Sequence, residues 1–330
     1  MLKPRVFVTR KLPEAGLRLL RDACQVEVWP DELPPPRMEL LSRAPGLAGI
    51  LSLITDHMDA EFMDTAPHLR VISNYAVGVD NVDVAAATQR RIVVGNTPGV
   101  LAETTADLAF ALLLATARQL PQGVDFIRAG KWRTWNPLDL LGPDVHHATL
   151  GIVGLGSIGC AMARRARGFD MRVIYSAPHR SSEKEREYGV EYRHLDDLLR
   201  EADFVSLHLP LSAETHHLID ARALGLMKAS AILINTARGP VVDADALYEA
   251  LASHRIWAAG LDVTEPEPLP RDHRLLALDN CVVVPHLGSA SFATRDRMAV
   301  LAAENLLAGL AGRPLPSSPN QREIGRAADG

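Results

Sequence analysis

The segment Leu150-Gly-Ile-Val-Gly-Leu-Gly-Ser-Ile-Gly159 carries glycines at positions 154, 156 and 159, in the spacing G-x-G-x-x-G. An apolar, strand-like run precedes the glycines, and Ser157–Arg167 has the pattern of a helix. In such a unit the first glycine allows a tight turn, the second lets the backbone approach a pyrophosphate, and the third lets helix and strand pack closely. The unpaired N–H groups at the start of the helix would face the phosphates. The segment therefore predicts a dinucleotide-binding βα unit.

Short apolar runs alternate with helical segments on both sides of this unit. One series of six predicted strands includes the glycine segment: Leu150–Val153, Arg172–Tyr175, Phe204–Leu207, Ile232–Asn235, Ala258–Leu261 and Val282–Val284. Six strands with helical spacers predict one doubly wound parallel sheet. An earlier series has strands at Arg5–Thr9, Gly49–Leu53 and Arg70–Ser73, with helices such as Glu14–Asp22 and Asp59–Thr65. The alternation predicts a second α/β domain.

Three further segments connect or follow these series. Leu101–Gln119 is apolar on all sides, which predicts a buried helix that braces two domains, and Thr97-Pro98-Gly99 before it is a turn typical of a hinge. Ala290–Leu310 is predicted to be a helix. Pro314–Gly330 is polar and rich in Pro and Ser, so we expect it to be unstructured.

The composition excludes several classes of protein. With 330 residues, 47% of them hydrophobic and 23% charged, the chain has the composition of a folded globular protein of about two domains. A net charge of -5 gives no reason to expect nucleic acid or an anionic membrane as a partner. The longest apolar run, Leu108–Ala117, is much shorter than the ~20 residues that a membrane span needs.

The chain start and the cysteines bear on the compartment. Lys3 and Arg5 lead directly into a strand, so no signal peptide is expected. The three cysteines are scattered, which argues against a disulfide framework, and Cys160 is expected to be a small packing residue. We therefore expect a cytoplasmic protein.

The residues after the second strand of the longer series bear on the choice of cofactor. An NAD site usually has an acidic residue about 20 residues after the glycine loop, to accept hydrogen bonds from the ribose 2′-hydroxyl. This chain has Ser176 there, followed by His179 and Arg180. A serine hydroxyl can donate to a 2′-phosphate and a guanidinium can pair with its charge. These residues favour NADP(H) over NAD(H); the alternative is a solvated surface turn with an incidental arginine.

Several separated motifs occur along the chain besides the glycine loop. They are Asn74–Asp80, Asn96–Val100, His208–Leu211, Asn235–Gly239, Gly260–Val263 with Glu267-Pro268, and Pro285–Ser289. Together, from Met1 to about Pro314, they resemble the motifs of one family, the D-isomer-specific 2-hydroxyacid dehydrogenases, and among them the glyoxylate/hydroxypyruvate reductases.

The resemblance implies a fold and an assembly. The fold would have two Rossmann-like α/β parallel-sheet domains, one flavodoxin-like and one dinucleotide-binding, with the cofactor domain inserted in the middle of the chain. Residues 1–98 plus 287–330 would bind substrate and residues 99–286 would bind NAD(P). The protein would be a homodimer joined through its cofactor domains.

The family's catalytic trio falls on Arg238, Glu267 and His286, each just past a predicted strand. Open α/β sheets bind ligands at that carboxyl edge. A guanidinium can bind the carboxylate and carbonyl of a 2-keto acid, and reduction needs a proton donor that works near neutral pH, for which histidine is suited. A neighbouring carboxylate would orient the imidazole and favour its charged form. Taken singly, each residue could instead be a surface ion pair, a loop charge or a core histidine.

The resemblance assigns other positions by motif. Substrate contacts would come from Leu53, the backbone N–H groups of Val77 and Gly78, Arg238 and Trp135. Cofactor contacts would come from Thr105, Gly154, Gly156, Ser157, Ile158, Gly159, Ser176, His179, Arg180, Leu209, Pro210, Thr215, Thr236, Ala237, Asp262, His286 and Gly288, with Asp262 accepting from the nicotinamide carboxamide. Trp135 matches a loop that reaches towards the partner subunit's active site, or else is an aromatic core residue. Leu138-Asp139-Leu140 follows where a second tryptophan is expected, which leaves the substrate preference open.

Two adjacent histidine pairs, His146-His147 and His216-His217, are not expected to bind a metal. Neighbouring side chains point in different directions on a helix or strand, and no carboxylate cluster is evident near them in the sequence. Arg180–Glu187 is expected to be a solvated, salt-bridged helix face.

The resulting hypothesis is an NADPH-preferring reductase of glyoxylate and hydroxypyruvate. One alternative is another dehydrogenase of the same scaffold, but a phosphite dehydrogenase should have lysine at Val77 and a formate dehydrogenase glutamine at Glu267. A long-form phosphoglycerate dehydrogenase should carry a further regulatory domain. A non-catalytic, nucleotide-sensing corepressor on this fold is the alternative from another class.

Overall fold

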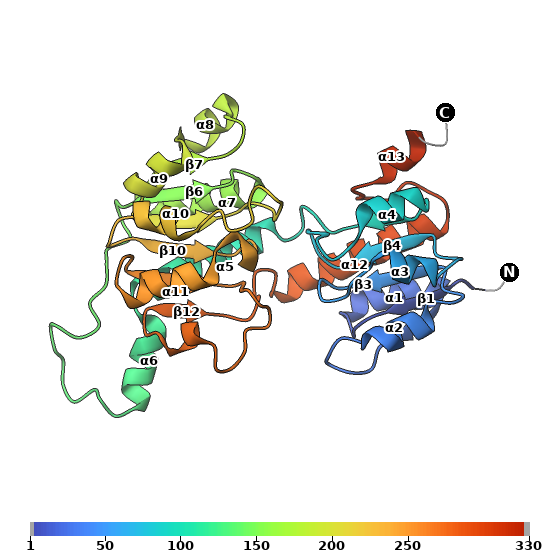
Figure 1. Ribbon diagram of the computed structural model, residues 1–330, viewed down its shortest axis with the longest axis horizontal. Helices are drawn as coiled ribbons and strands as arrows, with labels where there is room; N and C mark the ends of the chain where they lie inside the picture. Colours follow the sequence, from blue (N-terminus) through green and yellow to red (C-terminus); the bar gives the residue numbers. More distant parts are fainter. Residues whose placement is uncertain (1–2, 327–330) are drawn as a thin grey trace. The chain divides into compact units, whose positions relative to one another are not determined.

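The computed structural model describes residues 3–326, which form two compact units (Figure 1). Unit 1 comprises residues 1–101 and 290–330, and unit 2 comprises residues 102–289. The sequence placed the end of the first segment of unit 1 at residue 98 and the end of unit 2 at residue 286. In the structure these segments end three residues later, at 101 and 289. Each unit has a parallel sheet with helices on both faces.

Unit 1 is built on a five-stranded parallel sheet in the order β2-β1-β3-β4-β5. Its strands are β1 (Arg5–Val8), β2 (Gln25–Val28), β3 (Gly49–Ser52), β4 (Val71–Asn74) and β5 (Val93–Gly95). Its helices are α1 (Glu14–Ala23), α2 (Arg37–Arg43), α3 (Ala60–Asp64), α4 (Val84–Gln89), α12 (Phe292–Leu310) and α13 (Gln321–Arg326). One core lies between the sheet and α1 with α12, and another between the sheet and α2, α3 and α4. Parallel sheets are typically covered on both faces in this way.

The segment after α12 is packed, which corrects the expectation of an unstructured tail. Leu315 is buried, and the chain forms α13 before residues 327–330, which lie outside the described residues. The Asn320 side chain, fully buried, accepts from the Val94 N–H (2.9 Å) and donates to the Ile92 carbonyl (3.0 Å). These bonds satisfy backbone groups of β5 and the residue before it. A polar segment is ordered here because its amide side chain completes the edge of a sheet.

Replacing Asn320 with alanine should lower the free energy of unfolding by about 1–3 kcal/mol, because buried backbone groups lose their partners. Urea denaturation of the purified protein measures this change. Arg322→Ala, at an exposed position of α13, is the matched control and should change stability by less than about 0.5 kcal/mol. Equal stability of the two variants would contradict the role of Asn320.

Unit 2 is built on a seven-stranded parallel sheet in the order β12-β11-β10-β9-β6-β7-β8. Its strands are β6 (Thr149–Val153), β7 (Arg172–Ser176), β8 (Glu191–Tyr192), β9 (Phe204–Leu207), β10 (Ile232–Asn235), β11 (Ala258–Leu261) and β12 (Cys281–Val283). The six predicted strands are present, and β8 is an additional one. It was missed because it has only two residues, at the sheet edge, and no apolar run.

Helices cover both faces of this sheet. They are α5 (Ala102–Ala117), α7 (Ser157–Ala166), α8 (Ser182–Tyr188), α9 (Leu195–Glu201), α10 (Ala221–Leu226) and α11 (Ala244–Ala252). A further helix, α6 (Leu120–Arg128), follows α5, and short 3₁₀ turns lie at Arg167–Phe169, Gly239–Val241 and Arg274–Ala277. One core contains residues of α5 and α7, Cys160 among them, and the other contains residues of α9, α10 and α11. The predicted helix Leu101–Gln119 corresponds to α5, which packs against β10 and β11 of its own unit.

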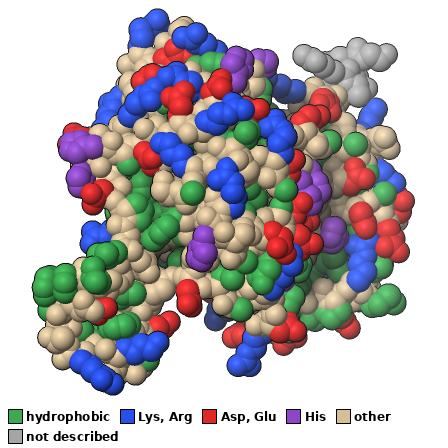
Figure 2. Space-filling view, turned by 60° about the vertical axis from the view of Figure 1, so that its left-hand side comes forward, with side chains coloured by type: hydrophobic (Ala, Val, Ile, Leu, Met, Phe, Trp, Pro, Cys, Tyr) green, Lys and Arg blue, Asp and Glu red, His purple; other side chains and the backbone are tan. Residues whose placement is uncertain are grey.

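The segment from α6 to β6 extends away from the rest of unit 2 (Figure 1) and carries much exposed apolar surface, visible at the lower left of Figure 2. No residue of α6 is buried. The exposed apolar side chains of this segment are Leu120, Val124, Ile127, Trp132, Trp135, Leu138, Leu140 and Leu141. Trp135 is 79% exposed, so the core alternative for this residue is wrong. Among residues 3–326, no helix is both long and apolar enough to cross a membrane.

Candidate active site

The glycine loop joins β6 to α7 at the carboxyl edge of the sheet in unit 2. Gly154 has φ +98°, and a Cβ on it would lie 2.4 Å from the His208 carbonyl oxygen, so only glycine fits there. A Cβ on Gly159 would lie 2.2 Å from the Gly154 carbonyl, which explains how closely α7 approaches the loop. The first and third glycines are thus required by the protein's own packing.

The surroundings of Gly156 fit a bound pyrophosphate. A Cβ on Gly156 would have nothing within 4 Å, and no side chain caps the N-terminus of α7. The first N–H groups of a helix carry partial positive charge and bind phosphate where no cap competes. Gly156, Ser157 and Ile158 are exposed or partly exposed there. The residues present therefore fit a dinucleotide.

The predicted residues of the 2′ position lie at the end of β7. Ser176 is buried, and its carbonyl accepts from the Gly154 N–H at 2.8 Å. His179 and Arg180 are exposed, and both nitrogens of the Arg180 fork bind the Glu185 carboxylate, at 2.8 and 2.9 Å. The charge of Arg180 is therefore already paired in the free chain, by Glu185 on α8. The expected ion pairing is thus present, but Arg180 precedes α8 and the Glu185 side chain is only 15% exposed, so the pair is not part of a solvated helix face.

Lys184 is a residue of this region that the sequence did not single out. Its ammonium donates to the Leu155 carbonyl of the glycine loop at 2.7 Å. The contact joins α8 to the loop across a separation of 29 residues, and no sequence pattern indicates it.

The predicted catalytic trio follows three adjacent strands. Arg238 follows β10, Glu267 lies in the loop after β11, and His286 follows β12. His286 Nδ1 lies 2.5 Å from Glu267 Oε1, and their side chains are 34% and 37% exposed. A Cβ on Gly239 would lie 1.9 Å from the Thr264 carbonyl, so glycine is needed where the turn after Arg238 meets the loop of Glu267. The structure therefore brings the three residues to one edge of the sheet.

Electrostatics keep Glu267 ionised. Burial opposes its charge, but the hydrogen bond and charge of His286, the Thr264 N–H and the charge of Arg238 outweigh burial and lower the pKa of Glu267. An ionised carboxylate at this distance fixes the imidazole by its Nδ1 and directs Nε2 away from it. The pair can therefore hold a proton for transfer at Nε2.

Asp262 fixes the backbone that carries His286. Its carboxylate accepts from the N–H groups of Leu287 (2.5 Å) and Gly288 (2.9 Å), and its carbonyl accepts from the His286 N–H (2.9 Å). His286 has φ +52°, a left-handed conformation that these bonds stabilise. Burial raises the pKa of Asp262. The N–H groups of Leu287 and Gly288 and the charge of His286 oppose this rise but do not cancel it. Asp262 is thus an anchor of the turn, in addition to its expected nicotinamide contact.

The remaining predicted cofactor residues line the same edge. Thr105 and Gly288 lie beside Asp262, since a Cβ on Gly288 would be 3.4 Å from Thr105 and 3.2 Å from the Asp262 carboxylate. Thr215 closes the turn after β9, where its hydroxyl donates to the Pro210 carbonyl (2.7 Å), and Leu209 lies beside Gly154. The Thr236 hydroxyl is buried and has no hydrogen-bond partner within the described chain. Ala237 is buried, and its N–H donates to the Asn235 side chain at 3.0 Å.

The predicted substrate residues of unit 1 lie together. Asparagine side chains hold the carbonyls of Leu53, Val77 and Gly78: Asn81 binds Leu53 (2.9 Å), Asn96 binds Val77 (2.8 Å) and Asn74 binds Gly78 (2.9 Å). No hydrogen bond to the N–H of Val77 or Gly78 occurs within residues 3–326. These N–H groups are thus available to an anion. The sequence motif included Asn74 and Asn96 but did not indicate this role.

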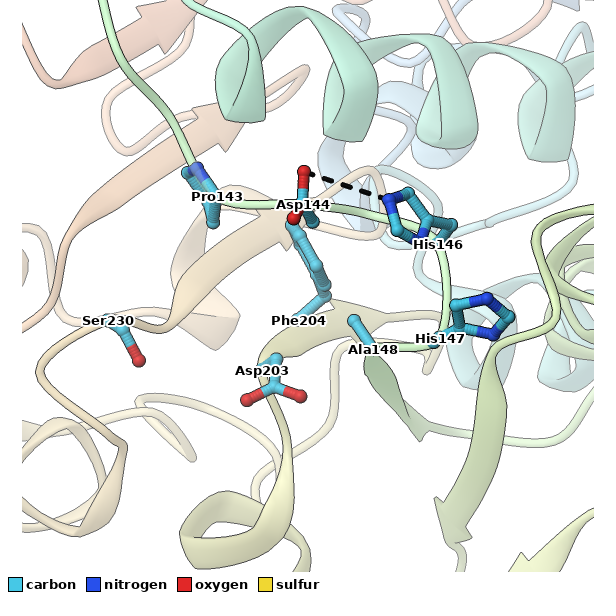
Figure 3. A pocket seen from close by; sticks show the side chains of 8 residues that line it. All are labelled: Pro143, Asp144, His146, His147, Ala148, Asp203, Phe204 and Ser230. Atoms are coloured by element: carbon cyan, nitrogen blue, oxygen red, sulfur yellow. Dashed lines mark ion pairs between the residues drawn. The ribbon is translucent and has the colours of Figure 1, made fainter.

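A cavity of about 280 Å³ lies at the opposite edge of the sheet in unit 2, before β6, β9 and β10 (Figure 3). His146, His147 and Asp203 line it, and His146 Nε2 is 3.8 Å from the Asp144 carboxylate. Since the glycine loop and the trio lie at the carboxyl ends of the strands, this cavity is not the cofactor site.

Comparisons with known proteins agree with this arrangement. Residues 110–288 match the family described as "D-isomer specific 2-hydroxyacid dehydrogenase, NAD binding domain". A glyoxylate reductase of Korarchaeum cryptofilum is 51% identical over 324 residues, which cover 98% of each chain. A solved structure from Thermus thermophilus superposes with a TM-score of 0.90 at 51% identity, covering 96% of this chain and 99% of that one. An NADPH-dependent glyoxylate/hydroxypyruvate reductase of Sinorhizobium meliloti, in complex with NADP and malonate, has a TM-score of 0.84 at 32% identity, with 96% of both chains covered.

Proposed function

Because the chain belongs to the D-isomer-specific 2-hydroxyacid dehydrogenase family, an oxidoreductase family with a nicotinamide dinucleotide cofactor, we propose that it reduces small 2-keto acids. The substrates are glyoxylate and hydroxypyruvate, and the products are glycolate and D-glycerate. The His286–Glu267 pair, 2.5 Å apart beside Arg238, carries this proposal. The relatives named as glyoxylate reductases support it.

Each member of the trio has a role in this reaction. A reduced nicotinamide, when bound, would supply the hydride for the keto carbon. His286 gives a proton to the keto oxygen, so that the carbonyl becomes a hydroxyl. Glu267 holds the imidazole in place through Nδ1. Arg238 binds the substrate carboxylate and carbonyl and stabilises charge on the oxygen as the hydride arrives.

Binding residues complete the proposal. The N–H groups of Val77 and Gly78 bind the substrate carboxylate, and Leu53 and Trp135 contact the substrate. The glycine loop and Ser157 bind the pyrophosphate, Thr105, Ala237, Asp262 and Gly288 surround the nicotinamide, and Leu209, Pro210 and Thr215 flank the adenosine. The open space at Gly156 supports the pyrophosphate site. The hydrogen bonds that Asn96 and Asn74 donate to the carbonyls of Val77 and Gly78 support the carboxylate site.

A panel of 2-keto acids tested for steady-state turnover with NADPH and NADH examines this proposal. We expect glyoxylate and hydroxypyruvate to be the best substrates. A corepressor-like protein of the same scaffold would bind pyridine nucleotide but turn over none of the acids.

A cytoplasmic location stays a prediction from composition.

The cofactor preference is a separate part of the proposal: NADPH over NADH, by about tenfold to a hundredfold in kcat/KM. With no carboxylate at Ser176, nothing there repels a 2′-phosphate. Arg180 can bind the phosphate only by leaving Glu185, so that ion pair limits the preference. The NADPH-dependent relative from Sinorhizobium meliloti supports the choice.

Four variants test this preference through the ratio of kcat/KM for the two cofactors. Arg180→Ala should lower the ratio towards unity and Ser176→Asp should reverse it. Glu185→Gln should raise the ratio, because it frees Arg180. Arg186→Ala, an exposed neighbour on α8, should leave it unchanged. A wild type that prefers NADH, or no change in Arg180→Ala, would contradict the phosphate pocket.

The proposed assembly is a homodimer formed through unit 2. The exposed apolar side chains of α6 and the following loop, with Trp135 among them, support it, since such surface is usually covered by a partner. Light scattering at micromolar concentration should give 71.8 kDa, twice the chain mass of 35.9 kDa. Ile127→Glu, which places a charge on α6, should shift the particle towards 35.9 kDa. A wild-type particle of 35.9 kDa would contradict the dimer.

A further inference from the structure

His216 and His217 lie in the turn after β9, and the structure places their side chains on the same side of the chain. His217 has φ +51°, a left-handed conformation that breaks the alternation of neighbouring side chains. The two imidazole rings are therefore stacked, with centroids 4.0 Å apart and planes inclined by 23°. The expectation that adjacent histidines diverge holds for regular strands and helices and is wrong here.

A carboxylate completes the group. Nε2 of His217 lies 3.0 Å from Oε2 of Glu265, in the loop after β11. One ligand atom from each of His216, His217 and Glu265 can be chosen so that all three lie within 4.8 Å of one another. Asp243 is the other charged group near His217, with its carboxylate 4.0 Å from Nδ1. The sequence indicated no cluster of cysteines or carboxylates near these histidines, whereas the structure places the carboxylates of Glu265 and Asp243 beside His217.

Backbone bonds hold the turn in place without a ligand. The His217 N–H donates to the Pro240 carbonyl at 2.8 Å, and Ile219 forms a bridge with Val242. His216 is exposed, while His217 and Glu265 are each 37% exposed, so an ion can reach the group from solvent. The three side chains are thus accessible and already close together.

We propose that His216, His217 and Glu265 form a binding site for a divalent transition-metal ion, represented by Zn²⁺. Imidazole with one carboxylate suits Zn²⁺, whereas Mg²⁺ and Ca²⁺ require oxygen ligands. Zinc–ligand distances of about 2.0–2.2 Å place tetrahedral donors roughly 3.3–3.6 Å apart. Ligand atoms that lie within 4.8 Å of one another must therefore close by up to about 1.5 Å, and His216, which is exposed, is the side chain with room to move. Water fills the remaining coordination position. The site does not rest on the proposed function.

The other histidine pair provides an internal comparison. The rings of His146 and His147 are 5.0 Å apart and perpendicular, and His146 has Asp144 at 3.8 Å. Within residues 3–326, only the group at His216 brings three ligand atoms together. Two adjacent histidines near a carboxylate therefore do not by themselves bring three ligand atoms together. At His216 and His217 the stacked rings and the nearby Glu265 carboxylate do so.

Titration of the purified full chain with Zn²⁺, followed by competition with a colorimetric chelator, tests the site. His216→Ala and Glu265→Gln should each weaken the site by at least about tenfold, because even indirect partners of metal ligands contribute that much. His146→Ala is the matched control and should bind as the wild type does. Mg²⁺ should not compete. His216→Ala should unfold at the wild-type temperature without metal, since His216 is exposed.

His286→Ala completes the design, because the His286–Glu267 pair could also attract Zn²⁺. Wild-type affinity in this variant, together with loss in His216→Ala, supports the proposed site. Equal affinity in His216→Ala and wild type would overturn it, and so would loss confined to His286→Ala or to His146→Ala. None of these measurements depends on turnover. The zinc-binding result can therefore be interpreted even if the proposed reductase function is wrong.

Discussion

Replacing His286 with alanine lowers turnover of a 2-keto acid about 10²- to 10⁴-fold, the usual contribution of one general acid. The keto oxygen then takes its proton from water. The affinity for NADPH should change little, because the proposed pyrophosphate site, at the glycine loop and the α7 N-terminus, does not include His286. Steady-state kinetics gives turnover, and fluorescence titration gives cofactor affinity.

Two further variants separate the acid from its partner. Glu267→Gln keeps a hydrogen-bonding group near His286 but removes the charged acceptor that orients the imidazole through Nδ1. Turnover should therefore fall, by less than in His286→Ala, because the proton donor is still present. His68→Ala, an exposed histidine of unit 1, is the control and should keep full turnover. Near-wild-type turnover of His286→Ala would refute the proton-donor role.

Replacing Arg238 with lysine has the second-largest expected effect, a loss of about 10²- to 10³-fold in kcat/KM for the keto acid. Lysine keeps the charge but loses the planar fork of donors that matches a carboxylate and a carbonyl. Part of the loss should appear in KM, because the fork binds the ground state as well. Kinetics at several keto-acid concentrations separates KM from kcat.

Arg238→Gln is the matched partner of this variant. Since the charge of Arg238 helps to lower the pKa of Glu267, Arg238→Gln should raise that pKa, whereas Arg238→Lys should keep it low. The acid side of the pH–activity profile should therefore move to higher pH in Arg238→Gln only. If both variants retained wild-type kcat/KM, Arg238 would not be the substrate clamp.

Much of unit 2 could be predicted from local patterns. Apolar runs indicated six strands, and three glycines with fixed spacing indicated the loop between β6 and α7. Arg238, Glu267 and His286 could be placed together because each follows a strand, and parallel neighbours end at one edge. Order along the chain and sheet topology were sufficient for these predictions.

Other features depend on contacts between distant residues and left no local pattern. Asn320 bonds to Val94 across 226 residues, so its polar segment resembled a free tail. Glu185 holds Arg180. The sequence allowed Arg180 either a 2′-phosphate contact or a place in a salt-bridged helix face, and could not decide between them.

The sequence by itself determined six strands of unit 2 and the glycine loop, because these follow from hydrophobic periodicity and from spacing along the chain. The proposed trio of Arg238, Glu267 and His286 was assigned by the resemblance of its motifs to one family. Only the tertiary structure decided which charges are paired. It also decided that His217 meets Glu265, 48 residues away, because a left-handed turn and the packing of two loops set that distance.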